Sequence, residues 1–323
     1  MVLGGPKRPW GRPGPVAPIL RRSQAAAQGC HDPDLRALLM RIEDDRVRQR
    51  ARLRRRALEL ELGIAGRTNP EPATTAVETP VPEPPAAPGG AGAPGALGVT
   101  ELDRPTPDLI RFKLPRPAEL TFVPGQALRL GSDGVSRRYT LASAPEEPFL
   151  EFFIRLVPGG RMSAQLASLQ LGMPLFVRSA AKGGLTLDPS RRYHLMVATG
   201  TGINPFVSML RHHLPRGLTD RVVLINGASF QDELAYRTEL EALERRYPNL
   251  VYIPTVSRPD DPRNSHWSDE TGRVEELLPG VLEAAALDPA ATAGYACGNP
   301  VMVDRVAAML KERGLPVRTE RYD

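Results

Sequence analysis

The sequence predicts an antiparallel β barrel followed by an α/β domain with a parallel sheet, both preceded by an N-terminal extension. Two observations lead to this prediction. Short β-like runs separated by turn residues fill 99–190, whereas strand patterns alternate with helix patterns over 191–323. The first pattern is typical of a barrel or sandwich, and the second of a parallel sheet covered by helices. The 323 residues, 41% of them hydrophobic, suffice for two domains of about 150 residues each plus an extension.

The extension divides into three segments by composition. Residues 1–31 are rich in Gly, Pro, Ala and Arg, and we expect a disordered leader rather than a transit peptide, because no amphipathic pattern is present. Residues 32–63 predict a highly charged helix that Asp32 caps and Gly63 ends. This helix is either a solvated helix or weak coiled coil, or a docking helix for an unknown protein. Residues 64–98 are rich in Pro, Gly and Ala, as semi-extended linkers are.

Charge and cysteine content exclude several classes of protein. The formal net charge of +5 falls entirely within 1–95, and this arm lacks the aromatics of a nucleic-acid module, so we expect no nucleic-acid partner. No run of about 18 apolar residues occurs, so we expect no membrane span and a cytoplasmic location. With only Cys30 and Cys297, and five histidines without ligand spacing, no metal site is expected. Redox chemistry would then need an organic cofactor or the metal of another protein.

Periodicity predicts the individual elements. In the barrel half, strands are expected at 109–114, 127–130, 136–143, 150–157 and 175–178, with one helix at 162–171. In the second half, strands are expected at 193–198, 221–226, 250–256, 294–297 and 316–321. Helices at 204–213, 233–246, 274–278 and 301–313 lie between them. This alternation predicts a Rossmann-like domain.

Four short motifs carry groups suited to an anionic ligand. Gly200-Thr-Gly-Ile-Asn-Pro205 joins a predicted strand to a helix, where backbone N–H groups attract a pyrophosphate; the alternative is a structural tight turn. Arg137-Arg-Tyr-Thr140 offers a guanidinium and a stacking ring, or is an ordinary exposed strand. Gly159-Gly-Arg-Met-Ser163 is a second anion site or a helix cap. Cys297-Gly-Asn-Pro300 ends a predicted strand at the mouth of the sheet, where α/β ligands bind; the alternative is an ordinary buried cysteine.

In this order, the four motifs resemble those of the ferredoxin–NADP reductase family, in particular its bacterial-type members, over residues 99–323. Phe122-Val-Pro-Gly-Gln126 resembles the turn that precedes the first FAD motif. The resemblance implies an FAD-binding barrel at 99–190 and an NAD(P)-binding domain at 191–323. It implies FAD contacts from Arg137, Tyr139, Thr140, Leu141, Ile154, Leu156, Gly160, Arg161, Met162, Ser163, Thr201 and Tyr322. It implies NADP contacts from Gly200, Thr201, Gly202, Pro205, Ser229, Arg258, Arg273, Cys297, Gly298, Asn299 and Pro300. Catalytic roles are implied for Thr140, Thr201, Cys297, Tyr322 and Glu320.

Two departures from the family pattern bear on these expectations. Ser229 stands where many NADP-using relatives carry an arginine for the 2′-phosphate. Arg258 matches a second phosphate-binding arginine of the family, and Arg273 is a further candidate cation. NADP(H) is therefore favoured and NAD(H) remains a competitor. Near the end of the chain, Tyr322 takes the place of the family's terminal aromatic residue. Glu320 is either a proton-handling group or a surface carboxylate.

The resemblance implies a flavoenzyme that transfers a hydride between NADP(H) and flavin N5 and exchanges single electrons with a separate ferredoxin or flavodoxin. Arg137, Arg138, Lys113 and Arg178 would steer an acidic carrier. Two alternatives stay open. One is an NADH-dependent reductase component of an oxygenase or other redox complex, and the other is a flavin-bearing interaction or sensor protein.

Overall fold

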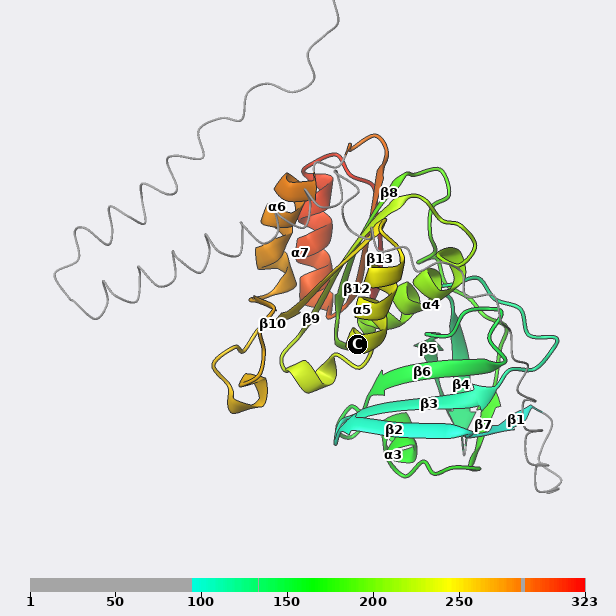
Figure 1. Cartoon of the computed structure of the whole chain (residues 1–323). Coiled ribbons are helices and arrows are strands. Elements are labelled where there is room, and N and C mark those ends of the chain that lie inside the picture. The colour runs from blue at the N-terminus through cyan, green and yellow to red at the C-terminus, as the bar shows by residue number, and fades with distance from the viewer. Residues whose placement is uncertain (1–94, 133, 286–287, 323) are drawn as a thin grey trace, which may run out of the picture. The chain divides into compact units, whose positions relative to one another are not determined.

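The computed structural model describes residues 95–132, 134–285 and 288–322, all of which belong to one compact unit (Figure 1). The predicted leader and charged helix, and most of the predicted linker, lie outside the described residues. Among the described residues, no helix has the length and apolar character needed to cross a membrane.

The first half consists of two antiparallel sheets, as the sequence predicts. One sheet has the strand order β1 (Ala96–Gly98), β7 (Pro174–Val177), β4 (Ala127–Ser132) and β5 (Val135–Thr140). The other has the order β2 (Glu101–Thr106), β3 (Leu109–Pro115) and β6 (Phe149–Arg155). The single helix α3 (Arg161–Ala167) follows β6. The two sheets enclose one apolar core, in which Phe112 stacks on Phe152 with ring centroids 5.4 Å apart.

Strand β6 connects this barrel to the second half of the molecule. Its side chains alternate between two cores, because successive residues of a strand point to opposite faces. Phe152 and Ile154 belong to the barrel core, whereas Phe153 belongs to the core of the second half. Leu109, at the start of β3, joins Phe153 there. Burial on both faces of β6 therefore attaches the barrel to the α/β half.

The second half is a parallel sheet of six strands in the order β11-β10-β9-β8-β12-β13. The strands are β8 (Tyr193–Thr199), β9 (Arg221–Ala228), β10 (Leu250–Val256), β11 (Glu270–Thr271), β12 (Thr292–Gly298) and β13 (Val317–Arg321). The helices are α4 (Asn204–His213), α5 (Arg237–Arg246), α6 (Val274–Ala285) and α7 (Pro300–Lys311). Helices α4 and α5 lie on one face of the sheet, and α6 and α7 on the other (Figure 1). The strand order reverses between β8 and β12, which is where ligands bind in open α/β sheets.

Several element boundaries differ from the sequence prediction. Strand β1 falls within the segment that was expected to be a linker, and strand β2 was not predicted. Helix α6 continues past Pro279 to Ala285 instead of ending at residue 278. Helix α5 begins at Arg237, because residues 231–233 form a separate 3-10 turn, η2 (Gln231–Glu233).

Candidate functional site

A cleft of about 850 Å³ lies between the barrel and the carboxyl ends of the parallel strands. We call it the central cleft. Of the residues predicted from sequence, those that line it are Arg137, Tyr139, Thr140, Ile154, Gly200, Thr201, Ser229, Arg273, Gly298, Asn299, Glu320 and Tyr322. Those that do not are Leu141, Leu156, Gly160, Arg161, Met162, Ser163, Gly202, Pro205, Arg258, Cys297 and Pro300. Both halves of the molecule thus contribute to one site.

The barrel wall of the cleft is positively charged. Arg137 and Arg138 are exposed residues of β5, and Arg129 of β4 lies opposite Arg138 in the antiparallel register. Within the described part of the chain, Arg137 donates only to the backbone oxygen of Ser136, at 3.3 Å. Its positive charge therefore remains available to an anionic group such as a phosphate. Burial raises the pKa of the neighbouring Tyr139 to about 12, so its hydroxyl stays neutral at physiological pH.

The sheet wall consists of two loops that follow β8 and β12. The first is the 3-10 turn η1 (Gly200–Ile203), which leads into α4, and the second is Gly298–Asn299, which leads into α7. A Cβ atom on Gly202 would overlap the carbonyl oxygen of Cys297, and one on Gly298 would overlap Thr199. Gly202 and Gly298 therefore allow the two loops to contact each other. The sequence had instead predicted that such motif glycines allow a ligand to approach the backbone. Gly200 has φ +54°, and a Cβ atom there would have no neighbour within 4 Å, so this glycine fits the predicted role.

A polar contact joins the two walls at the end of the cleft nearest β13. Thr140 Oγ1 on β5 donates to Glu320 Oε1 on β13, at 2.8 Å. Burial raises the pKa of Glu320, although the Thr140 hydrogen bond and the charge of Arg138 act in the opposite direction. Glu320 therefore retains a proton at a higher pH than an exposed glutamate does. The Tyr322 backbone N–H donates to the Gly298 oxygen at 2.9 Å, which holds the end of the described chain against the β12 loop.

Cys297 lies behind the cleft wall. Its side chain is fully buried in β12, opposite Glu320 of β13 in the parallel register. Burial raises the pKa of the Cys297 thiol, so the sulfur is protonated at neutral pH. The next residue, Gly298, is the one that lines the cleft.

The far end of the cleft combines a carboxylate with two arginines. The Ser229 backbone N–H donates to Glu233 Oε2 at 3.0 Å, and Arg155 of β6 donates to Glu233 Oε1 at 2.9 Å. Arg273 lines this part of the cleft. Arg258 is exposed, outside the lining, with its guanidinium carbon 5.2 Å from the centroid of the Phe230 ring. The sequence matched Arg258 to a phosphate-binding arginine of the family and offered Arg273 as a further candidate, and of the two it is Arg273 that lines the central cleft.

Asn204, Arg155 and Glu233 line the cleft but were not among the residues predicted from sequence. Asn204 donates through Nδ2 to the backbone oxygens of Phe153, at 2.8 Å, and Thr140, at 3.4 Å. These two acceptors fix the amide orientation, and the buried Oδ1 then has no partner among the described residues. An unpaired buried acceptor is costly, so its position in the cleft fits a ligand that donates a hydrogen bond. The sequence feature that could have identified Asn204 is its place at the first position of a helix, directly after a glycine turn.

The residues of the cleft fit a large anionic cofactor better than a metal ion. Arginines line the barrel wall, and the orphaned Asn204 acceptor lies where α4 begins. Among the described residues, no three His, Cys, Asp or Glu side chains are grouped so as to hold a metal. The barrel and the sheet each supply one wall, which suits a site shared by two bound molecules.

Two family models match the two halves of the chain separately. The oxidoreductase FAD-binding domain matches residues 104–183, within the barrel. The oxidoreductase NAD-binding domain matches residues 196–308, within the parallel-sheet half. The fold and the site therefore define an oxidoreductase that binds FAD and a nicotinamide dinucleotide.

Comparison with individual proteins shows which family of oxidoreductases the chain belongs to. Ferredoxin–NADP reductase B of Sorangium cellulosum is 37% identical over 206 residues, which is 61% of this chain and 82% of that protein. The electron transfer component of toluate 1,2-dioxygenase from Pseudomonas putida is 31% identical over 208 residues, 64% of this chain and 59% of that protein. The crystal structure of a ferredoxin NADP⁺ reductase from Neisseria gonorrhoeae with bound FAD and NADP matches with a TM-score of 0.62 and 30% identity, covering 70% of this chain and 97% of that one. The chain belongs to the ferredoxin/flavodoxin–NADP reductase family.

Proposed function

We propose that this enzyme transfers reducing equivalents between NADP(H) and its FAD, and exchanges single electrons with a separate ferredoxin or flavodoxin. The observation that carries the proposal is the central cleft, in which Thr140 of the barrel and Thr201 of the η1 turn line one cavity. When bound there, FAD supplies the conversion between a two-electron hydride and single electrons. Family membership favours such an enzyme over a flavin-bearing interaction or sensor protein.

The chain's own residues have distinct roles in this proposal. Arg137 and Arg138 hold the FAD pyrophosphate, because their guanidinium groups make charge-assisted hydrogen bonds to phosphate. The Asn204 Oδ1 accepts a hydrogen bond from a bound cofactor. Thr140 and Glu320 hold a proton at the boundary between the two walls, since they are hydrogen-bonded across it at 2.8 Å.

The carrier is a separate protein in this proposal. The two cysteines of the whole chain, Cys30 and Cys297, are too few for an iron–sulfur cluster held by four cysteines. Because the FAD pyrophosphate offsets the charge of Arg137 and Arg138, exposed Arg178 is the member of the predicted group that steers an acidic carrier. Lys113 was predicted to belong to the same steering group, but its charge is offset by a salt bridge to Glu101 at 2.8 Å.

The first experiment is the visible absorption spectrum of the purified protein, recorded before and after anaerobic addition of NADPH. An oxidised-flavin spectrum that bleaches supports the proposal, and adding oxidised ferredoxin or flavodoxin should then restore the absorbance in a single turnover. A protein that stays colourless after reconstitution with FAD would overturn it.

A second candidate function is supported by Ser229, which lines the central cleft. Its side chain is neutral and supplies no positive charge for the 2′-phosphate that distinguishes NADP from NAD. This arrangement supports an NADH-dependent reductase component of an oxygenase or other redox complex. The ratio of kcat/KM for NADPH to that for NADH separates the two candidates: a ratio above one supports the first, and a ratio below one supports the second.

A further inference from the structure

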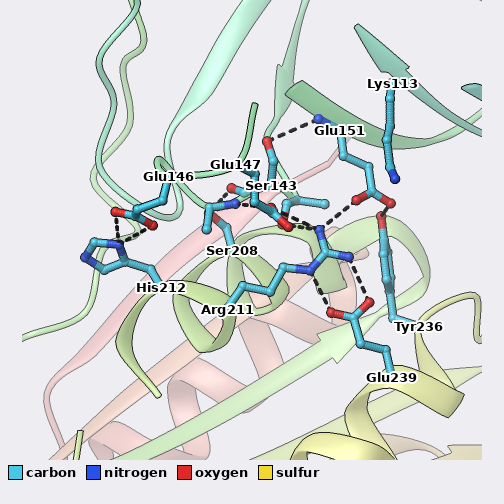
Figure 2. Close-up of polar contacts among 12 residues, drawn as sticks. Lys113, Ser143, Glu146, Glu147, Glu151, Ser208, Arg211, His212, Tyr236 and Glu239 are labelled. Carbon is cyan, nitrogen blue, oxygen red and sulfur yellow. Dashed lines mark hydrogen bonds and ion pairs between the residues drawn. The ribbon is translucent and has the colours of Figure 1, made fainter. Parts of the chain in front are cut away.

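Arg211 is a largely but not fully buried cation on α4, surrounded by three carboxylates, at the junction of the two halves of the molecule (Figure 2). It forms a two-pronged contact with Glu239, from Nε to Oε1 at 2.6 Å and from Nη2 to Oε2 at 2.8 Å. Its Nη1 donates to Glu151 Oε2 at 2.6 Å and to Glu147 Oε2 at 3.4 Å. The Arg211 side chain is 15% exposed and that of Glu151 only 2%.

The three carboxylates come from different parts of the fold. Glu239 lies on α5, within the α/β half, whereas Glu147 and Glu151 belong to the barrel half. Although burial disfavours its charge, the hydrogen bond to Glu239 and the charges of Glu151, Glu239 and Glu147 raise the pKa of Arg211. Arg211 is therefore permanently charged, and its guanidinium joins the two halves.

Two further residues on the same face of α4 also contact the barrel. Ser208 Oγ donates to the backbone oxygen of Ser143 at 2.6 Å (Figure 2), and Asn204 Nδ2 donates to that of Phe153 at 2.8 Å. Positions 204, 208 and 211 follow the spacing that places side chains on one face of a helix. We call Asn204, Ser208 and Arg211, with their barrel partners, the polar joint.

The polar joint also fixes the barrel strand that it contacts. The Glu151 backbone N–H donates to Ser143 Oγ at 3.1 Å, and Tyr236 donates to Glu151 Oε1 at 3.1 Å (Figure 2). Both oxygens of this buried carboxylate are therefore occupied. The lateral position and the rotation of β6 relative to α4 are set by directional bonds rather than by apolar contact alone.

The two elements of the joint lead directly into the two walls of the central cleft. On β6, Glu151 is followed by Phe153, Ile154 and Arg155, which line the cleft. Helix α4 begins at Asn204, immediately after the η1 turn, and Arg211 lies roughly 10 Å further along the helix axis. A shift of β6 against α4 would therefore move the barrel wall against the sheet wall.

We propose that Arg211 is a positioning residue, which, through Glu151, sets the distance between the flavin bound by the barrel and the nicotinamide bound by the sheet. This inference rests on the proposed function. Buried ion pairs often add little stability over well-packed apolar residues, whereas charge-assisted hydrogen bonds are strongly directional. Hydride transfer requires the reacting atoms about 3–3.5 Å apart, and a displacement of about 1 Å costs roughly 100-fold in rate.

The test uses the FAD-loaded full-length protein and the rate at which saturating NADPH bleaches the flavin. Arg211→Met should lower this limiting rate about 10- to 100-fold, with less change in the half-saturating NADPH concentration. Because Arg211→Met leaves Glu151 unpaired and destabilises the fold, the double variant Arg211→Met/Glu151→Gln is measured beside it. Removing that charge should restore stability while the rate stays low. Arg211→Lys, which keeps the charge and loses the two-pronged contact, should be intermediate.

Arg237→Met is the matched control, because Arg237 pairs with Glu241 and Asp269 inside the α/β half. It should bleach at the wild-type rate. If the double variant recovers rate together with stability, the role of Arg211 is only structural and the proposal is overturned. A folded Arg211→Met variant with an unchanged rate would also overturn it.

Hydrogen exchange of the protein without nucleotide gives a readout independent of turnover. Amides of residues 149–155 should exchange faster in the double variant than in wild type, and Arg237→Met should leave them unchanged. Unchanged exchange in the double variant contradicts a joint that holds β6. If neither NADPH nor NADH bleaches the wild-type flavin, the proposed function fails, and the exchange result alone then decides whether the joint exists.

Discussion

The Thr140–Glu320 pair couples the protonation of one half-buried carboxyl to the contact between the barrel and the sheet. Glu320 is held on β13 while its hydrogen-bond donor lies on β5, so the pair forms only when both halves are in place. The raised pKa of Glu320 results from burial. The effect of this raised pKa on stability depends on how far it differs from the pKa of Glu320 in the unfolded chain.

We predict that Glu320→Gln changes the pH dependence of stability. Glu320 has a folded-state pKa above its ordinary value of 4.5, so the folded state binds its proton more tightly. Its favourable contribution is present below pH 4.5 and is lost as the pH rises through the folded-state pKa. The free energy of unfolding of the variant relative to wild type should therefore increase over that interval, with a slope of at most about 1.4 kcal/mol per pH unit.

Urea unfolding of both proteins between pH 4 and 8 measures this difference. Glu312→Gln, at an exposed position after α7, is the control and should give a curve parallel to that of wild type. Parallel curves for Glu320→Gln as well would mean that burial does not perturb this carboxyl.

A second prediction concerns the choice between nicotinamide dinucleotides. Arg273 lines the cleft, whereas Arg258 lies outside it against Phe230. Arg273→Gln should raise KM for NADPH about 10- to 100-fold, since a charge-assisted hydrogen bond contributes about 1.5–3 kcal/mol, and leave KM for NADH unchanged. Arg258→Gln should change neither. Steady-state kinetics with both nucleotides is the measurement, and a larger effect at Arg258 would reverse the assignment.

About half of the predicted site residues line the cleft. The cleft residues that the sequence analysis did not predict have a physical cause in common. The motif glycines, Arg137 and Thr140 are recognisable because their chemistry is local to a turn or a strand. Asn204 gains its role from the Phe153 carbonyl, 51 residues away in sequence. Glu233 gains its role from Arg155, which is 78 residues away. Neither pairing has a sequence pattern, because only the folding of β6 against α4 and η2 creates it.

At the scale of elements, the strongly apolar ones were predictable and the weakly apolar or very short ones were not. Strand β10 (Leu250–Val256) and helix α4 match the prediction in both boundaries. Strand β2 reads Glu-Leu-Asp-Arg-Pro-Thr and lies at a sheet edge with most side chains exposed or half-buried, so it lacks the alternation that identifies a strand. In α6, burial of Leu277, Leu278 and Val281 offsets the hydrogen bond that Pro279 cannot make.

The contact between the η1 and β12 loops leads to a prediction about Gly202. A methyl group there would overlap the Cys297 carbonyl oxygen, which would force apart the two loops that form the sheet wall. Gly202→Ala should lower the free energy of unfolding by about 1–3 kcal/mol, the usual cost of overpacking, and weaken nucleotide binding. Gly184→Ala, at a position where a Cβ has no neighbour within 4 Å, is the control. Denaturant titration measures the change in the free energy of unfolding, and nucleotide titration measures the change in affinity. If Gly202→Ala lowers neither, the two loops can separate without cost.

At the scale of the whole molecule, the described barrel and α/β half carry both apolar cores. Every described residue of the two cores lies at position 97 or later. Strand β1, at Ala96–Gly98, pairs with β7 and packs Leu97 against the barrel core. Among the described residues, β1 is thus the first element that contributes to these cores.

We therefore predict that deleting residues 1–94 leaves FAD affinity and melting temperature unchanged within error, because β1 and both cores are retained. Deleting residues 1–98 should lower the melting temperature, because β7 loses its partner strand and Leu97 is removed. Fluorescence titration with FAD and thermal melts compare the two truncations. Loss of FAD binding in the shorter deletion would place part of the flavin site within residues 1–94.

The polar joint also limits how the two halves can be recombined. The barrel core lies within the barrel half, but Leu109 and Phe153 of that half belong to the core of the α/β half, so a chimera that takes its barrel from a relative also replaces part of the second core. Arg211 would keep its contact with Glu239, but its Nη1 would face whatever residue the donor barrel carries at position 151, and without a glutamate there the contact that joins the two halves would be lost. Domain shuffling within this fold must therefore transfer a compatible pair of residues along with the domain, and a functional library of chimeras should be enriched in those that do.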